Sequence, residues 1–284
     1  MTHAAYQLFS PAVRSTCVVF ASPHSGRAYG ETFRGQARLD DLAIRSSEDA
    51  FVDELFAQAP AHGAPLLTAI TPRAFVDFNR ASEELDPALI EGVRRMSPNP
   101  RVASGLGVIP RVVAGGRAIH EGKISLEQAH ARITRHWRPW HDRLQTLLDE
   151  SGRLFGRSIL IDCHSMPHEA LDSMAGARPD VVIGDRFGAS AAAAIVAEVT
   201  AALTDAGLRV VRNAPFAGAY VTQHYGKPVR HQHALQIEID RALYMHERTM
   251  EKRADFDDFC RLLDGVTARI AAIGAADDRA LAAE

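Results

Sequence analysis

Two periodicities of apolar positions alternate along the chain. Short apolar runs rich in β-branched residues predict strands at 17–21, 66–70, 74–78, 108–113, 158–163, 180–183, 208–211 and 234–239. Apolar positions at helical spacing predict helices at 47–58, 125–151, 189–206 and 256–273. Because strands and helices alternate, the pattern predicts an α/β protein: a three-layer α/β/α arrangement around a central mixed, largely parallel sheet.

Local signals refine the borders of these elements. Ser125 and Gln128 fit a capping box at the start of the long helix, and Pro139 should kink or divide that helix. The stretch 81–107, rich in Pro, Asn, Ser and acidic residues, predicts a long excursion between elements. We find no repeat and no linker, so we expect residues 1–284 to form a single domain.

Composition narrows the class of protein. Of the 284 residues, 46% are hydrophobic and 24% are charged, which is typical of a globular chain. The net charge of −3 provides no general attraction to nucleic acid or to an anionic membrane. No apolar run approaches the roughly 20 residues of a membrane span, and no signal peptide is evident. We therefore expect a cytoplasmic protein with a small-molecule partner; no oligomeric state is indicated.

Polar side chains stand at the ends of two predicted strands, where parallel sheets bind ligands. His24 follows 17–21 within a Ser-Pro-His-Ser-Gly loop. Asp162 and His164 lie two positions apart at the end of 158–163, so they share a face, whereas Cys163 takes the other face. Both histidines are candidate metal ligands, with Asp162 as an orienting partner. Taken alone, His24 is better explained as a histidine satisfied by the local backbone, and the segment 162–165 also fits a polar loop with a buried Cys163.

Two further segments carry candidate chemistry. Glu238 shares one face of 234–239 with Gln236 and Asp240, and a carboxylate in a buried strand is costly unless it is paired or bound. It is a candidate base or ligand, with a solvated edge strand as the alternative. Asn79 and Arg80 offer forked donors for a carboxylate, although Arg80 can instead pair with a nearby acid.

A carboxylate at a predicted helix start completes the set. Glu48 or Asp49 can cap the helix or ligate a metal beside His24. Two histidines, one carboxylate and an open position make a hydrolytic zinc site, although the same donors also suit cobalt or manganese. Because no HExxH motif is present, the ligands must converge from distant segments.

Seven stretches in order along residues 17–246 resemble the N-formylglutamate amidohydrolase (N-formylglutamate deformylase) family. They are SPHSGRAY, SSEDAFVDELF, PRAFVDFNRASEELDP, GLGVIPRV, LIDCHSMP, VVIGDRFG and HALQIEIDRALYM. The family is similar in fold to zinc carboxypeptidases and to deacylases of N-acyl amino acids. The resemblance implies zinc-dependent hydrolysis of the formyl amide of N-formyl-L-glutamate to formate and L-glutamate, late in histidine degradation.

The same resemblance implies roles for the candidate residues. His24 and His164 would bind one zinc ion, with a third ligand from the SSED segment, where Asp49 is favoured over Glu48. Glu238 would be the catalytic base.

Asn79 and Arg80 match the pair that grips a substrate carboxylate in the family. The second carboxylate of the substrate requires another cation. The stretch 220–226 is either a loop over the site or an ordinary surface loop. Candidates for the second cation are Arg73, Arg186, Arg230 and His224.

Three alternatives compete with this interpretation. The chain could be another zinc amidohydrolase, a deacylase or a carboxypeptidase-like enzyme, acting on a different N-acyl amino acid or peptide. Cys163 could be a nucleophile, although its predicted direction away from His164 argues against this. The chain could also be a non-catalytic binding module that keeps the fold.

Overall fold

The computed structural model describes residues 4–94, 99–172, 174 and 176–275. Within them a seven-stranded sheet has the order β1-β3-β2-β4-β7-β5-β6. The central strands β3, β2, β4 and β7 are parallel, whereas β1 joins β3 and β5 joins β7 in antiparallel pairs. The sheet strands are β1 Tyr6–Phe9, β2 Val18–Ser22, β3 Leu66–Ala69, β4 Ser158–Met166, β5 Val181–Gly184, β6 Val210–Arg212 and β7 Gln232–Asp240.

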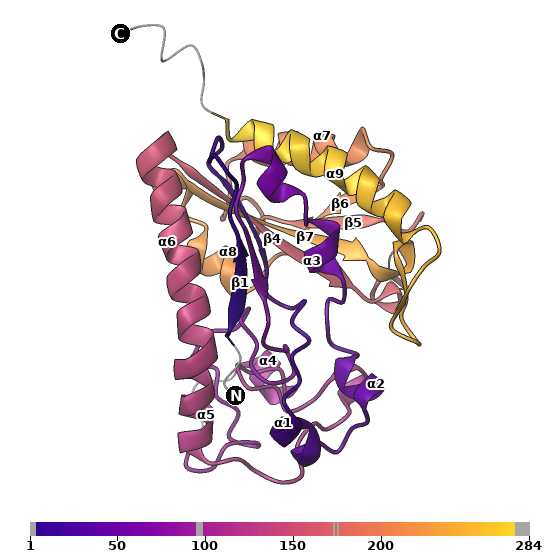
Figure 1. The fold of residues 1–284 in the computed structure, drawn as a ribbon. Coiled ribbons are helices and arrows are strands. Elements are labelled where there is room, and N and C mark those ends of the chain that lie inside the picture. Colours follow the sequence, from indigo (N-terminus) through magenta and orange to yellow (C-terminus); the bar gives the residue numbers. More distant parts are fainter. Residues whose placement is uncertain (1–3, 95–98, 173, 175, 276–284) are drawn as a thin grey trace, which may run out of the picture.

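Helices cover both faces of this sheet (Figure 1). α6 and α8 pack on one face, and α3, α7 and α9 lie on the other. Bounds of the helices are α1 Glu31–Gln36, α2 Asp41–Arg45, α3 Val52–Leu55, α4 Pro100–Ala103, α5 Leu126–Arg132, α6 Arg138–Phe155, α7 Ala193–Thr204, α8 Tyr220–Tyr225 and α9 Phe256–Ile273. The predicted three-layer class with a mixed, largely parallel sheet is confirmed.

Short elements complete the architecture. A small antiparallel pair, β8 Met245–His246 and β9 Glu251–Lys252, stands apart from the main sheet. Short 3₁₀ turns occur at Ala59–His62, Ala114–Gly116, His168–Leu171, Pro228–Arg230 and Arg241–Leu243. None of the helices among the described residues is both long and apolar enough to cross a membrane.

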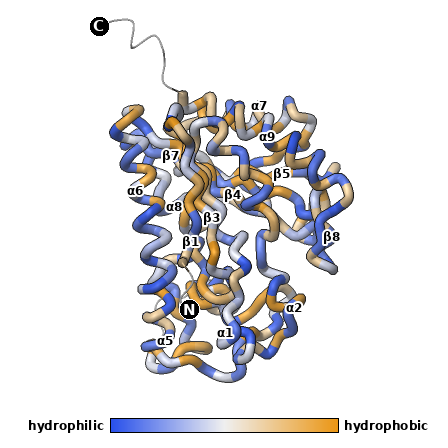
Figure 2. The backbone as a smooth tube through the Cα atoms, viewed as in Figure 1, coloured by the Kyte–Doolittle hydropathy of each residue, from blue (hydrophilic) through white to orange (hydrophobic). Residues whose placement is uncertain are grey.

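Alternation along the central strands assigns each side chain to one layer of core. Val18 and Phe20 of β2 pack against α3 and α9, whereas Val19 and Ala21 pack toward α6. In β4 the same alternation sends Cys163 into the α9 side and Leu160 into the α6 side. Figure 2 shows the hydrophobic colouring concentrated in these central strands. Polar residues of β4 and β7 that share the α6 face therefore lie beyond the core at the carboxyl ends of the strands.

Two predictions around the site are wrong. The helix expected over 47–58 is only α3, because Phe51 has a left-handed backbone (φ 64°) and the backbone N–H of Asp49 donates to His24 O at 3.0 Å. The strand expected over 74–78 is a series of turns. Its buried apolar side chains mimic a strand, but the N–H of Asp77 bonds to Val108 O at 2.8 Å rather than to the sheet.

Two further segments differ from expectation, and one strand was missed. Residues 108–113 form no strand and contribute only an isolated bridge between Val112 and Ala118. Residues 220–226 are mostly the helix α8 rather than a loop. The edge strand β1 was not predicted, because its four residues carry only a weak alternating pattern.

The predicted interruption of the long helix takes the form of a π-helical segment, η3, at Ile133–Trp137 between α5 and α6. The N–H of Arg138 bonds to Ile133 O, five residues back, and Pro139 stands in the first turn of α6. Pro139 has no N–H for the carbonyl of Arg135. The backbone hydrogen bonds therefore change to a spacing of five residues at η3, and the helix continues into α6. The capping box of Ser125 and Gln128 is present as predicted.

Candidate metal and substrate site

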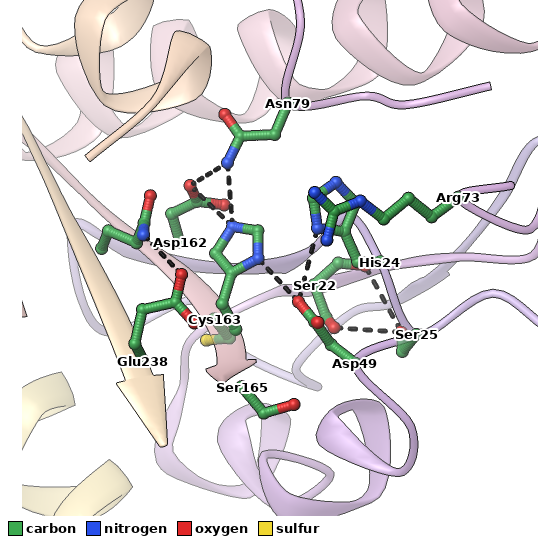
Figure 3. Close-up of polar contacts among 12 residues, drawn as sticks. Ser22, His24, Ser25, Asp49, Arg73, Asn79, Asp162, Cys163, Ser165 and Glu238 are labelled. Atoms are coloured by element: carbon green, nitrogen blue, oxygen red, sulfur yellow. Dashed lines mark hydrogen bonds and ion pairs between the residues drawn. The ribbon is translucent and has the colours of Figure 1, made fainter. Parts of the chain in front are cut away.

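Three buried side chains from distant segments meet at the carboxyl ends of β2 and β4 (Figure 3). One nitrogen of His24, one nitrogen of His164 and one oxygen of Asp49 lie within 4.8 Å of one another. Asp49 Oδ2 is 2.8 Å from His164 Nδ1 and 3.4 Å from His24 Nδ1. His24 Nδ1 is buried without a hydrogen-bond partner among the described residues. An orphaned imidazole nitrogen turned toward a second imidazole and a carboxylate fits a metal-binding donor set.

The outer nitrogen of each histidine faces a carboxylate. His24 Nε2 donates to Asp77 Oδ1 at 2.7 Å, and His164 Nε2 lies 3.0 Å from Asp162 Oδ2. Such carboxylate–histidine pairs fix the tautomer and leave Nδ1 as the ligand atom. The sequence assigned this orienting role to Asp162 but missed Asp77, whose partner His24 lies 53 positions away.

The chain places His24 by close packing of its loop. The loop after β2 crosses the end of β3 at Gly26, where a Cβ atom would lie 2.2 Å from Thr71 O. Glycine is therefore required for this approach. Asp49 enters the site because its backbone is tied to His24, as described above. Glu48 instead forms a salt bridge with Arg45 at 3.1 Å, so Asp49 is the acid that lies between the two histidines.

Contacts within the cluster shift the pKa values of Asp49 and His164 in opposite directions. Burial opposes ionisation of Asp49, but the hydrogen bond with His164 and the nearby His24 outweigh it and hold the Asp49 pKa well below its usual range. Burial would lower the pKa of His164, but the neighbouring Asp162 and Asp49 raise that pKa well above its usual value. The cluster therefore concentrates negative charge that a cation can neutralise.

Glu238 stands beside this cluster on the adjacent strand. In the register of β4 and β7 it is the direct partner of His164. Its Oε1 accepts a 2.7 Å hydrogen bond from Gln236 Nε2, and among the described residues no hydrogen bond involves Oε2. Burial is the main cause that raises the pKa of Glu238 to about 7, against the opposing charge of His164. A carboxylate with this pKa can take up and release a proton near neutral pH.

A cavity of about 650 Å³ opens over these groups, and we call it the metal-site cavity. Its wall includes the loop around Gly115 and the segment 215–219, which stands directly before α8. Four arginines also line it: Arg73, Arg80, Arg101 and Arg241. A cavity of this size, with arginines and a candidate metal-binding group in its wall, suits a small anionic ligand.

Asn79 and Arg80 both line the cavity but differ in how they are engaged. Asn79 Nδ2 lies 3.3 Å from Asp162 Oδ2 and 3.1 Å from His164 Nε2, and its Oδ1 accepts from Val221 N at 2.8 Å. Arg80 donates from Nε to Leu106 O and from Nη1 to Asn79 O. Among the described residues no hydrogen bond involves Arg80 Nη2, so this edge of the guanidinium can meet a ligand.

Only one of the four candidates for a second cation lines the cavity. Arg73 does, with its Nε 3.1 Å from Asp77 Oδ2, whereas the other three are not among the lining residues. The sequence missed Arg101 and Arg241 as lining cations. Arg241 donates to Asp49 Oδ1 at 3.0 Å, and its position directly after the 234–239 run was the available signal.

Comparisons with known proteins relate the chain to one family. A model of the N-formylglutamate amidohydrolase family matches residues 16–245. An N-formylglutamate deformylase of Pseudomonas aeruginosa is 31% identical over 230 residues, 78% of this chain and 80% of that protein. One of Pseudomonas putida is 26% identical over 81% of this chain and 82% of that protein. The crystal structure of an N-formylglutamate amidohydrolase from Ralstonia eutropha JMP134 superposes with a TM-score of 0.90 at 32% identity, over 96% of this chain and 99% of that one.

Proposed function

This chain belongs to the N-formylglutamate amidohydrolase family, and on that premise we propose that it hydrolyses N-formyl-L-glutamate to formate and L-glutamate with one bound zinc ion. The observation that carries the proposal is the cluster of His24, Asp49 and His164 beside Glu238 in a cavity lined by arginines. Relatives named for this reaction provide the substrate class. We further propose that it acts in the cytoplasm, in histidine degradation.

His24 Nδ1, His164 Nδ1 and an oxygen of Asp49 would hold the metal. The donor set of two imidazoles and a carboxylate is one that zinc prefers, and it leaves a position open. Bound zinc polarises a carbonyl oxygen and lowers the pKa of a coordinated water to about 7. Asp77 and Asp162 would keep both imidazoles in the tautomer that this binding needs.

Glu238 would move the protons of the reaction. Its Oε2 would accept a proton from the attacking water and deliver that proton to the departing glutamate nitrogen. Gln236 holds Oε1 and so fixes the direction in which Oε2 points. The raised pKa of Glu238 suits both halves of this transfer, because the same carboxyl must first bind the proton and then give it up.

Arg80 would bind one carboxylate of the substrate through its free edge, with Asn79 beside it. Arg73, Arg101 and Arg241 are the cavity arginines that remain for the second carboxylate, and of these Arg73 and Arg241 also pair with Asp77 and Asp49. Two fixed arginine contacts would hold the formyl carbon where water can attack it, and such positioning supplies a large part of the rate enhancement of an enzyme.

The test measures formate released from N-formyl-L-glutamate by the purified protein, before and after chelation and again after zinc is added back. We expect activity that the chelator removes and zinc restores. Absence of formate from a protein that holds zinc would overturn the substrate assignment. Activity that is indifferent to chelation, in a protein shown to be free of metal, would overturn the metal assignment.

A second candidate function follows from the size of the cavity. Its volume of about 650 Å³ leaves room for acyl groups larger than formyl. The chain would then be a zinc deacylase of other N-acyl amino acids. N-acetyl- and N-succinyl-L-glutamate in the same assay separate the two, because a higher kcat/KM on either than on the formyl compound would favour this candidate.

A further inference from the structure

A second cavity, of about 430 Å³, lies between α1, the segment that follows β3, and the α5–η3 junction. We call it the second cavity, and none of its lining residues lines the metal-site cavity. In Figure 1 α1 and α5 lie together at the end of the molecule opposite α7 and α9. Its walls include Phe33 from α1, Phe75 after β3, and Ala131 and Arg132 from α5.

Arg132 is the only described residue of this cavity that combines a charge with near-complete burial; it is 9% exposed. Its Nη1 donates to Phe75 O at 3.2 Å. Its Cζ lies 4.1 Å from the ring centroid of Phe75 and 5.6 Å from that of Phe33. Across the described part of the chain Nε and Nη2 make no hydrogen bond, and neither is a fully enclosed atom. The free edge of the guanidinium is therefore open to the cavity.

Arg132 has no acidic partner among the residues that the structure describes. No Asp or Glu of these residues lines the second cavity, and none forms an ion pair with Arg132. Two more basic side chains, Arg135 and His136, line the same space. Burial alone lowers the pKa of Arg132 to about 10. The aromatic faces compensate for only part of the cost of a buried cation, so the site favours an anion.

The apolar part of the wall selects the kind of anion, although Thr32, Gln36, Thr71 and Gln128 also line the cavity. Phe33, Phe75, Pro72 and Ala131 give an apolar surface beside the guanidinium. Inorganic phosphate would leave this surface without a partner, whereas an organic carboxylate would cover it. A planar guanidinium also matches a carboxylate in a bidentate manner.

We propose that the second cavity is a binding site for a small organic carboxylate. The carboxylate contacts the free edge of Arg132, and the apolar body of the ligand lies against Phe33, Phe75 and Ala131. The site is separate from the proposed hydrolytic site, and its argument does not depend on that reaction.

The test is a calorimetric titration of the protein with benzoate, with benzamide as a neutral molecule of the same shape. Arg132→Met keeps the length of the side chain but removes the charge. Arg138→Met is the matched control, because Arg138 is exposed on the same helical segment and does not line the cavity. We expect Arg132→Met to weaken benzoate binding at least tenfold, Arg138→Met to leave it unchanged, and benzamide to bind at least tenfold more weakly than benzoate.

A second variant tests the cavity without removing the charge. Ala131→Leu fills the space from a helical position that tolerates leucine, and we expect it to weaken benzoate binding at least tenfold. Thermal unfolding of each variant checks that it is folded. Benzoate bound in the metal-site cavity would survive both substitutions. Titrations of Arg132→Met and Ala131→Leu that match wild type therefore overturn the proposal, as does failure of wild type to bind benzoate. Displacement of benzoate by equimolar phosphate would overturn the assignment to an organic carboxylate.

Discussion

Arg73 and Arg132 are both largely enclosed arginines in cavity walls, yet their surroundings act on them in opposite directions. Burial would lower the pKa of Arg73, but Asp77 and Asp49 raise it above the usual value. Burial lowers the pKa of Arg132, and within the described part of the chain no acid opposes this shift. Arg73 therefore belongs to a network of paired charges around the metal-site cavity, whereas Arg132 meets two aromatic faces. Enclosure of an arginine alone says little about its role; the presence or absence of a carboxylate partner distinguishes the two cavities.

The largest difference between the two cavities should be catalytic. Glu238→Gln keeps the shape of the side chain but removes the carboxylate, so we expect kcat for N-formyl-L-glutamate to fall about 10²–10⁴-fold. Zinc content should remain at one ion per chain by elemental analysis, since Glu238 is not among the proposed ligands. Activity near the wild-type level would remove Glu238 from the mechanism. Arg138→Met, outside both cavities, serves as the control for handling and purity.

Substitution of Arg73 and of Arg132 should change the free energy of unfolding in different ways. Arg73→Met leaves the buried Asp77 without one of its cationic partners, and we expect a loss of about 1–3 kcal/mol in the free energy of unfolding. Arg132→Met replaces an unpaired buried cation with an apolar side chain, so the free energy of unfolding should stay the same or rise. Urea denaturation of the metal-free proteins measures both. Equal losses in the two variants would contradict the distinction drawn above.

Substrate capture should depend on Arg80. We expect Arg80→Ala to raise KM at least tenfold, about 1.4 kcal/mol, with a smaller change in kcat. Steady-state kinetics on N-formyl-L-glutamate measure both constants. The matched substrate N-formyl-L-alanine lacks the side-chain carboxylate and shows which carboxylate Arg80 binds. Unchanged KM and kcat would reject Arg80 as a substrate ligand.

A smaller and more gradual effect should appear in the pH dependence of the free energy of unfolding. Burial lowers the pKa of His141 to about 3, so this histidine is neutral in the folded protein down to low pH. The unfolded chain, with an ordinary value of 6.5, binds the proton first. Stability should therefore be lost as the pH falls below about 6.5, by up to about 1.4 kcal/mol per pH unit from this group. His141→Gln should reduce that slope in urea denaturation at pH 7, 6 and 5; an unchanged slope would contradict the assignment.

Sequence patterns located those candidate site residues that stand at strand ends. His24, His164 and Glu238 could be found because apolar runs locate β2, β4 and β7, and alternation then assigns the faces. Asp77 and Arg241 were not found, because their roles depend on contacts with His24 and Asp49 from distant segments. The resemblance favoured Asp49 over Glu48, and the structure separates the two because Asp49 is tied to His24 whereas Glu48 pairs with Arg45.

The sequence did not predict the second cavity, for a related reason. Arg132 stands within a regular helical pattern, and an arginine on a helix is ordinarily solvated or paired. Its burial follows from Phe33 of α1 and Phe75 after β3, which pack over it, and local periodicity does not report such packing. That none of the described acidic residues lines the second cavity is a property of the assembled walls.

The π-helical segment η3 also sets the relative directions of Arg132, which lines the second cavity, and His141 in α6. In an unbroken α-helix, Arg132 and His141 would point in roughly opposite directions, about 180° apart. One extra residue in the turn at Ile133–Trp137 rotates the rest of the helix back by about 100°, so both side chains face inward. The extra residue in η3 thus acts as a rotational offset between α5 and α6. Its loss would turn either Arg132 or the buried face of α6 toward water.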